Sequence, residues 1–305
     1  MASSESENVH KPFDRQTVLE MLKRLRRSDS KRSIFGSAAH DYELQPPLPL
    51  SAIEAFEREH GIRLPEDYRY FITEIGNGGA GPYYGLFPFG QDDDAVSWEE
   101  GELIGDVSRP FPHVEAWNLP DSFWEQEPDV SPDTPPEEED RLWEEWDRLE
   151  QEHYWHPSII NGAIPICHLG CALRQWLVVH GEQRGFVWND FRADHRGIFP
   201  VRDEAGRQKT FSEWYLSWLD KATRQATLVG RVVGLLSRGH KLRAVKLYEE
   251  QQAGSDAAEA ERAVEAIAAH HEIASQRSRR RDLLVALMLI VLGAVLGLVL
   301  GLWRR

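Results

Sequence analysis

A glycine-rich stretch at residues 76–81, GNGGAG, is where residue types and spacing first suggest chemistry. Gly76, Gly78 and Gly81 have the G-x-G-x-x-G spacing of a dinucleotide-binding turn, in which a strand precedes the glycines and a helix follows them. Here the order is reversed, because the pattern predicts a helix over 65–76 and a strand over 82–90. We therefore expect the glycines to end a helix and form a tight reversal, with Asn77 tolerating left-handed geometry.

Other reactive side chains lack the spacing that a catalytic or metal site needs. Cys167 and Cys171 enclose a histidine, but zinc requires two further ligands, and His153 and His156 stand at no recognised spacing from them. The acidic residues 92–94 are adjacent rather than alternate, unlike those of a calcium loop. The chain also has no G-x-S-x-G elbow and no phosphate-binding lysine loop. We predict that the protein is not an enzyme and holds no cofactor or metal, and that both cysteines are small buried thiols at a strand end.

The charge of the chain limits its partners. Its 305 residues include 35 basic and 50 acidic side chains, a formal net charge of −15. Residues 277–305 hold six arginines and one acid, which leaves 29 basic and 49 acidic residues, a net of −20, in residues 1–276. Such a body repels nucleic acid and attracts basic proteins, although acid also serves simply to keep a protein soluble. We predict no nucleic-acid partner.

Apolar periodicity predicts several helices. They cover residues 14–27, 50–61, 65–76, 137–155 and 211–225. Ser51 is the expected N-cap of the second helix, and Gly61 is expected to stop it. The last helix has aromatic residues at the i, i+3, i+4, i+7 spacing of a core-facing side: Phe211, Trp214, Tyr215 and Trp218.

Short apolar runs broken by Gly, Pro and Asn-Asp predict strands within 158–170, 172–181, 184–190 and 197–201. The second and third runs read as a hairpin. Between the third predicted helix and these strands, residues 91–157 form an acidic segment rich in Pro and Trp.

Five short motifs occur in a fixed order along residues 48–222. They are LP-x-x-Y (Leu64, Pro65, Tyr68), N-G-G (Asn77, Gly78, Gly79), G-C (Gly170, Cys171), G-x-x-x-G-x-V-W (Gly181, Gly185, Val187, Trp188) and F-x-x-W-Y-x-x-W (Phe211, Trp214, Tyr215, Trp218). Together these motifs resemble the SUKH superfamily, which includes the Smi/Knr-type fungal cell-wall regulators and many bacterial immunity proteins. The acidic, Trp-rich insertion at 91–157 is a departure from the family pattern.

The resemblance implies an α+β fold, with a curved, mainly antiparallel sheet and helices packed outside it. It also implies a binding module rather than an enzyme. Bacterial members typically bind and neutralise a toxin, often a nuclease, so a basic toxin is one expected partner. The alternative is a membrane-tethered scaffold in cell-envelope or stress regulation, as in the fungal relatives. In both cases the motif residues either build the fold or contact the partner.

Residues 223–276 are similar to the C-terminal helical motif of the bacterial ribosomal stalk protein, which favours a bacterial origin. The matching residues are Gly239, Lys241, Ala244, Lys246, Glu259, Ala260, Val264 and Glu265. In the stalk protein this surface receives translational GTPases through a K-E-A-K sequence, but here Ala258 and Glu261 replace the two lysines. The alternative, which we prefer, is a small helical hairpin that serves as a spacer or a dimerising unit.

The C-terminal segment predicts a membrane anchor. Residues 283–303 carry no charge over a length that spans roughly the 30 Å hydrocarbon core of a bilayer, and Trp303 stands at the end of the run. Arginines are more numerous before the run than after it, so the N-terminal body is predicted to be cytoplasmic. Gly293, Gly297 and Gly301 lie on one helix face and suggest a homodimer through this helix.

The predicted organisation is an N-terminal helix and turn-rich segment (1–47), a SUKH-like domain (48–222), a stalk-like helical motif (223–276), and a basic flank with a transmembrane anchor (277–305). The N-terminus itself has no secretory signal.

Overall fold

The computed structural model describes residues 13–91, 104–252 and 256–273. The chain divides into two units. Unit 1 comprises residues 1–27 and 34–223, and unit 2 comprises residues 28–33 and 224–305. The division between Thr223 and Arg224 falls inside a helix, α8 (Phe211–Ser237), which continues well past the predicted end at residue 225.

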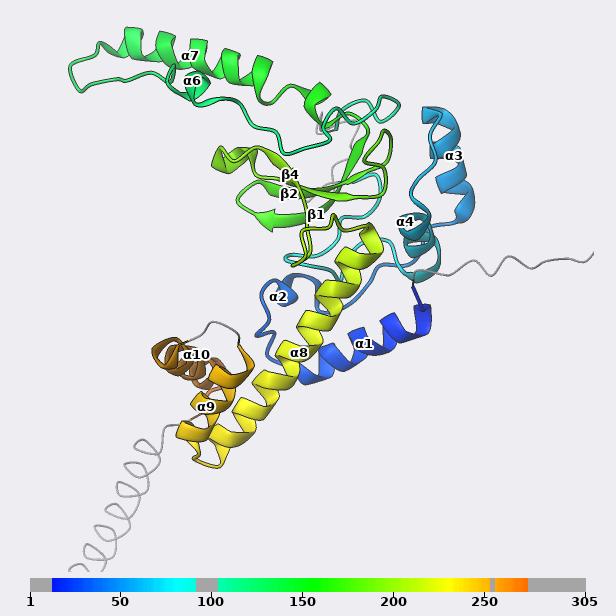
Figure 1. Ribbon diagram of the computed structural model, residues 1–305, viewed down its shortest axis with the longest axis vertical. Coiled ribbons are helices and arrows are strands. Elements are labelled where there is room, and N and C mark those ends of the chain that lie inside the picture. Colours follow the sequence, from blue (N-terminus) through cyan, green and yellow to red (C-terminus); the bar gives the residue numbers. More distant parts are fainter. Residues whose placement is uncertain (1–12, 92–103, 253–255, 274–305) are drawn as a thin grey trace, which may run out of the picture. The chain divides into compact units, whose positions relative to one another are not determined.

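Unit 1 is built around a four-stranded antiparallel sheet with the order β1-β2-β3-β4 (Figure 1). The strands are β1 (Ala163–Gly170), β2 (Leu173–Val178), β3 (Val187–Asp190) and β4 (Ile198–Pro200). The predicted hairpin is β2 paired with β3, and its register places Trp176 opposite Trp188. With helices packed against this sheet, the α+β prediction is confirmed.

Two helices precede the glycine stretch largely as predicted. The first, α1, covers Arg15–Ser28 and buries Val18, Leu22 and Leu25, which repeat at helical spacing. A short helix, α2 (Ser37–His40), was not predicted, and α3 covers Leu50–His60. Gly61 ends α3 in the left-handed conformation, as expected, but Ser51 is not the N-cap. Pro49 stands at that position instead, because its fixed φ of −66° suits the entry to a helix.

The predicted helix at 65–76 has two geometries. Pro65 is the N-cap of α4 (Glu66–Tyr70), and a π-helical turn, η1 (Phe71–Ile75), follows it. The Gly76 amide donates to the Phe71 carbonyl at 3.0 Å, five residues back. The predicted apolar face is confirmed, since Tyr68, Phe71, Ile72 and Ile75 are all buried.

The core of unit 1 is aromatic. Phe13 lies 5.4 Å from Phe71 and 6.0 Å from both Phe211 and Tyr215, measured between ring centroids. Edge and tilted ring contacts of this kind add to the burial of apolar area. Residues before position 47 therefore complete the core of unit 1.

A second core cluster lies on the sheet. It combines residues of all four strands with one residue of the 3₁₀ turn η2 (Pro157–Ile160) and one from the loop at 104–120: Phe111, Ile160, Ala163, Trp176, Val178, Trp188 and Ile198. The insertion thus contributes Phe111 to the core on the sheet.

The insertion carries α6 (Asp121–Trp124) and the predicted long helix, α7 (Pro136–His153), which lie together in Figure 1. Phe123 and Trp124 pack on Trp146 at 5.2 and 6.2 Å. Trp124 also stacks on His195 at 4.4 Å. Residues 121–153 contain 14 acidic and two basic (Lys/Arg) side chains, a difference of −12. We call residues 121–153 the acidic arm.

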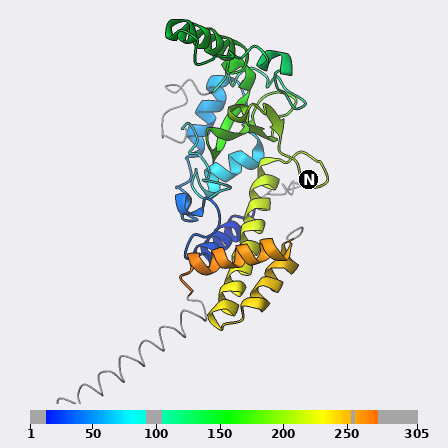
Figure 2. The same ribbon diagram turned by 90° about the vertical axis from the view of Figure 1, so that its left-hand side faces the viewer.

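Unit 2 is helical. The C-terminal part of α8 packs with α9 (Lys241–Gln251) and α10 (Ala257–His270) around Leu228, Val232, Ala244 and Val264 (Figure 2). Asp256 caps α10 by accepting a hydrogen bond from the Glu259 amide at 2.7 Å. Ala244 of α9 and Val264 of α10 thus meet in one core.

No helix within the described ranges 13–91, 104–252 and 256–273 is long and apolar enough to cross a bilayer. The predicted span at 283–303 lies outside those ranges, together with Gly293, Gly297 and Gly301, and it stays a prediction.

Candidate functional site

In the glycine stretch, the backbone packs closely against another segment of unit 1 and is hydrogen-bonded to α8. Gly78 and Gly79 have φ values of 87° and 93°, whereas Gly76 is extended at 176°. A Cβ on Gly79 would lie 2.4 Å from the Glu43 carbonyl oxygen, so this glycine admits the chain's own backbone. The Tyr215 hydroxyl donates to the Ala80 carbonyl at 3.0 Å and joins the stretch to α8.

Two predictions for this region are wrong. Asn77 is not left-handed; its buried side-chain oxygen accepts a hydrogen bond from the Phe89 amide at 2.8 Å and closes the loop that follows. Residues 82–90 do not form a strand, because only Leu86 makes isolated bridges there, to Gly79 and Cys167. Positive φ at Gly85 and Tyr83 interrupts the pairing.

Hydrogen bonds within unit 1 join the other motifs to one another. Arg184, between Gly181 and Gly185, donates to the carbonyls of Arg63 and Leu64 at 2.9 and 2.7 Å. Both of these glycines have positive φ, so they shape the turn that carries the arginine.

Helix α4, which carries the LP-x-x-Y motif, is also joined to α8 by a hydrogen bond. Asp67 accepts from the Ser212 amide at 2.8 Å and so caps α8. Trp214 donates from its indole to Gln175 on β2 at 3.1 Å. Leu64, Tyr68, Trp188 and Phe211 are buried, and Trp218 is half-buried. These motif side chains therefore pack within the fold of unit 1.

The cysteines differ from one another. Cys167 on β1 is buried, and burial raises the pKa of its thiol far above the ordinary value. Cys171 is exposed, which corrects the prediction that both are buried. It follows Gly170 in the turn between β1 and β2, where Gly170, Cys171 and Ala172 all have positive φ. Among the described residues, no group of three His, Cys, Asp or Glu side chains is arranged to hold a metal ion.

One charged pair is fully enclosed. Arg192 donates to both carboxylate oxygens of Asp190, at 2.9 and 2.7 Å, and the two side chains are 5% and 9% exposed. Trp176 donates to Asp190 at 3.1 Å, and Arg192 also donates to the Tyr154 carbonyl at 2.9 Å. With its charges paired and its hydrogen bonds made inside the fold, this group anchors the insertion to the sheet.

His113 makes the stability of unit 1 depend on pH. In the tautomer protonated on Nε2, it donates to the Ile159 carbonyl at 2.9 Å. Burial lowers the pKa of His113 below its ordinary 6.5, and the charge of Arg192 lowers it further, against that hydrogen bond. The unfolded chain therefore binds the proton more readily, so this stability is full above about pH 6.5 and declines as the pH falls below it, by at most about 1.4 kcal/mol per pH unit.

We expect the loss of stability between pH 7.5 and pH 5.0 to be smaller in His113→Gln than in the parent protein, because glutamine keeps a donor for Ile159 and does not titrate. Urea unfolding followed by tryptophan fluorescence at the two pH values measures this. Equal losses in the two proteins would contradict the assignment.

An exposed aromatic cluster of unit 1 lies beside the G-C motif, since a Cβ on Gly170 would lie 3.0 Å from the Tyr84 ring. Phe35, Tyr83 and Tyr84 are 63%, 40% and 42% exposed. The Phe35 ring lies 6.4 Å from Tyr83 and 5.3 Å from Tyr84, in edge geometry. Tyr84 in turn lies 5.5 Å from the His168 ring on β1. We call Phe35, Tyr83 and Tyr84 the aromatic surface.

The backbone holds the aromatic surface in a strained form. Tyr83 has a φ of 52°, a conformation that costs a residue with a side chain roughly 1–2 kcal/mol. Gly36 faces it, and a Cβ on Gly36 would lie 1.6 Å from the Tyr83 carbonyl oxygen. Partial burial, with a smaller contribution from Cys167, raises the pKa of Tyr83, so its hydroxyl remains a hydrogen-bond donor. Strain of this kind concentrates at functional sites.

The sequence pattern does not single out this surface. It predicts a strand that includes PYYG, and alternate side chains of a strand face opposite sides of a sheet. The sequence signal that was available is the Tyr-Tyr pair between two glycines, Gly81 and Gly85, but the partner Phe35 lies far away in sequence.

Comparison with known proteins places the chain in a family. Neither the curated proteins nor the solved structures gave a match. The sequence model of the SMI1 / KNR4 family (SUKH-1) matches residues 47–215. This range agrees closely with the predicted 48–222 and covers more than half of the chain, and it leaves the stalk-like segment outside. The chain belongs to the SMI1 / KNR4 family (SUKH-1).

Proposed function

We propose that this protein is a non-catalytic protein-binding module of the immunity type, which neutralises a basic toxin while tethered to a membrane. Membership of the family supports the binding role. The observation that carries the proposal is the aromatic surface, because it is exposed, close-packed and held by strained backbone.

The chemistry of the aromatic surface suits a protein partner. Aromatic side chains, tyrosine above all, lose little conformational entropy on binding and dominate the binding energy of many interfaces. Phe35 offers an apolar face, and the hydroxyl groups of Tyr83 and Tyr84 offer polar ends. A phosphorylated or nucleic-acid ligand would need basic side chains, and the net charge of the chain opposes it.

The acidic arm supplies long-range attraction for a basic partner. Its charge is displayed on an ordered helix, since Trp146 is buried while Glu137, Glu144 and many neighbouring acids are exposed. Charge of one sign on a surface raises the rate of encounter with a partner of the other sign more than it alters the lifetime of the complex.

We expect neutralising Glu137, Asp140 and Glu144 together, by Gln, Asn and Gln, to lower the association rate constant roughly three- to tenfold at low salt and to leave the dissociation rate nearly unchanged. Stopped-flow or surface-based kinetics at two salt concentrations measure both. A matched control neutralises Glu20, Glu54 and Glu66, which are exposed acids of unit 1 outside the arm. If the control variant slows association as much as the arm variant, the arm has no special role.

The membrane tether rests on the sequence of residues 283–303 and the arginine-rich 277–281 before it. It would hold the binding module at the cytoplasmic face, where a toxin entering the cell first arrives.

Copurification tests the proposed function. The tagged full chain is expressed with the products of its adjacent genes, and growth is measured when a candidate toxin is induced. Capture of one adjacent product, together with restored growth, is the expected result. Capture of several host proteins with no adjacent toxin would favour the alternative scaffold in envelope or stress regulation.

A further inference from the structure

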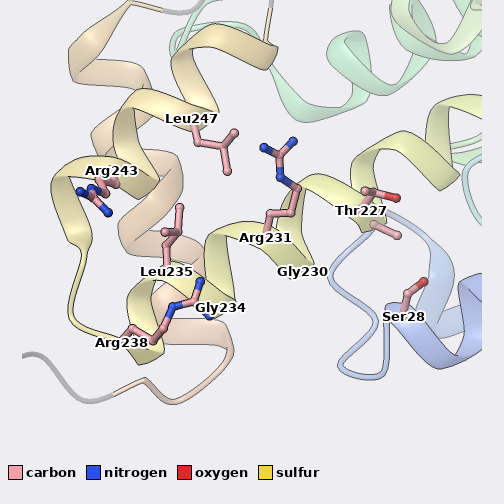
Figure 3. A pocket seen from close by; sticks show the side chains of 10 residues that line it. Ser28, Thr227, Gly230, Arg231, Gly234, Leu235, Arg238, Arg243 and Leu247 are labelled. Atoms are coloured by element: carbon pink, nitrogen blue, oxygen red, sulfur yellow. The ribbon is translucent and has the colours of Figure 1, made fainter.

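Unit 2 contains a cavity of about 630 Å³ between α8 and α9 (Figure 3). Its volume lies in the range of small-ligand sites. Three arginines line it: Arg231 on α8, Arg238 in the turn directly after α8, and Arg243 on α9. Leu235 and Leu247 supply apolar wall, and no acidic side chain is among the lining residues.

The positive charge of this cavity meets no carboxylate in the part of unit 2 that the structure describes. Among the described residues, none of the three arginines forms an ion pair with a carboxylate. Lys241 at the start of α9, by contrast, binds Glu261 at 2.8 Å and Glu265 at 2.6 Å. Glu261 and Glu265 of α10 are therefore engaged by Lys241, and the arginines remain available to an anion.

Two glycines keep the cavity open. Gly230 and Gly234 are one turn apart on α8, and neither has positive φ. A Cβ on Gly230 would meet nothing within 4 Å, and one on Gly234 would meet only the Arg238 guanidinium, at 3.8 and 3.9 Å. Glycine destabilises a helix interior relative to alanine, so neither backbone geometry nor close packing explains why glycine stands at these two positions. Their effect is to leave space beside the arginines.

The sequence after the described part of unit 2 points to the occupant. Leu283, the start of the predicted span, is ten positions after Ile273, the last described residue, so a chain at most about 35 Å long joins the described part of unit 2 to that span. Basic residues this close to a cytoplasmic leaflet meet anionic lipid. Leu242, which precedes Arg243, is 86% exposed and offers an apolar contact.

We propose that this cavity binds the phosphate headgroup of an anionic membrane lipid. Arg231, Arg238 and Arg243 bind the phosphate, and the leucine side of the cavity accepts the apolar part next to it. The choice of a lipid as occupant rests on the membrane tether proposed above. The presence of the arginine-lined cavity does not depend on that tether.

The test titrates the full chain, purified in neutral detergent, with dihexanoyl phosphatidylglycerol. Dihexanoyl phosphatidylcholine and inorganic phosphate are the parallel probes, and amide hydrogen exchange of peptides within 224–252 is the readout. We expect protection by the phosphatidylglycerol alone. In Arg231→Gln/Arg238→Gln the apparent Kd should rise about tenfold or more, since each basic residue at an anionic surface contributes roughly a fivefold factor.

A matched control, Lys246→Gln/Arg262→Gln, removes the same charge at exposed positions outside the cavity. It should bind as the parent does. Gly230→Leu fills the cavity without changing charge, and it should weaken binding as the arginine variant does.

Equal protection by inorganic phosphate, or equal Kd values in the cavity and control variants, would overturn the lipid proposal. Flotation of the full chain with neutral phosphatidylcholine vesicles tests the tether separately. Failure to float would remove the tether, and the titration would still decide whether the cavity binds the lipid.

Discussion

Replacing Arg192 by methionine is expected to lower the free energy of unfolding of unit 1 by about 3–5 kcal/mol. The change leaves the Asp190 carboxylate buried without its partner, and it also removes the donor to the Tyr154 carbonyl. Removing one member of a buried ion pair costs far more than the pair contributes, because the remaining charge has lost its compensation. Urea unfolding followed by tryptophan fluorescence measures the change, since every described tryptophan lies in unit 1.

Arg207→Met is the matched control. Arg207 pairs with Asp203 at 2.7 Å, but its side chain is 76% exposed, so we expect a loss below about 1 kcal/mol. The double variant Asp190→Asn/Arg192→Met should recover part of the loss, because no uncompensated charge remains. A loss below about 1 kcal/mol for Arg192→Met would show that the site relaxes or admits water.

The second large effect concerns binding. We expect Tyr83→Asn/Tyr84→Ala to weaken the complex with the captured partner about 30-fold or more, since truncating a hot-spot tyrosine costs 2 kcal/mol or above. Asparagine tolerates the left-handed conformation at position 83, so the turn keeps its shape while the ring is lost. Calorimetric titration of partner into each protein measures the change.

Leu50→Ala is the control for this variant. Leu50 is 46% exposed on α3, comparable to the two tyrosines, and it lies outside the aromatic surface. It should bind with the parent affinity, and the urea midpoint of the tyrosine variant should stay near that of the parent. Affinity within threefold of the parent for the tyrosine variant would exclude the aromatic surface as the main contact.

Local patterns were sufficient where neighbours in sequence decide the structure. The face of α8 that carries Phe211, Trp214 and Tyr215 follows from helical spacing, and the β2–β3 hairpin follows from two apolar runs around Gly181 and Gly185. The five motifs also identified the family before any fold was known.

Features that depend on distant contacts were not predictable in this way. The aromatic surface requires Gly36 to approach Tyr83 and requires a positive φ at a tyrosine, which no local rule favours. Asn77 was expected to tolerate a left-handed backbone in the turn. Its side-chain oxygen instead accepts a hydrogen bond from the amide of Phe89, which follows in a later loop. The π-helical turn after Tyr70 was hidden for the same reason, because its apolar spacing also fits a regular α-helix.

The burial of the charged pair Asp190 and Arg192 was also not predictable from the sequence. Two residues so near in sequence usually form an exposed pair of little energetic value. Their burial comes from Trp155, whose ring lies 4.9 Å from the guanidinium, and from Tyr154, both supplied by the end of the insertion. An insertion that reads as an acidic departure from the family therefore also completes the core.

Amide hydrogen exchange of the full chain, alone and with its captured partner, tests the central claim most directly. Binding through the aromatic surface predicts slower exchange in peptides that contain residues 34–36 and 82–85, with little change in the core of α8 at 214–219. Protection confined to other surfaces, with unchanged exchange at 34–36 and 82–85, would contradict the proposal that this protein binds its partner through Phe35, Tyr83 and Tyr84.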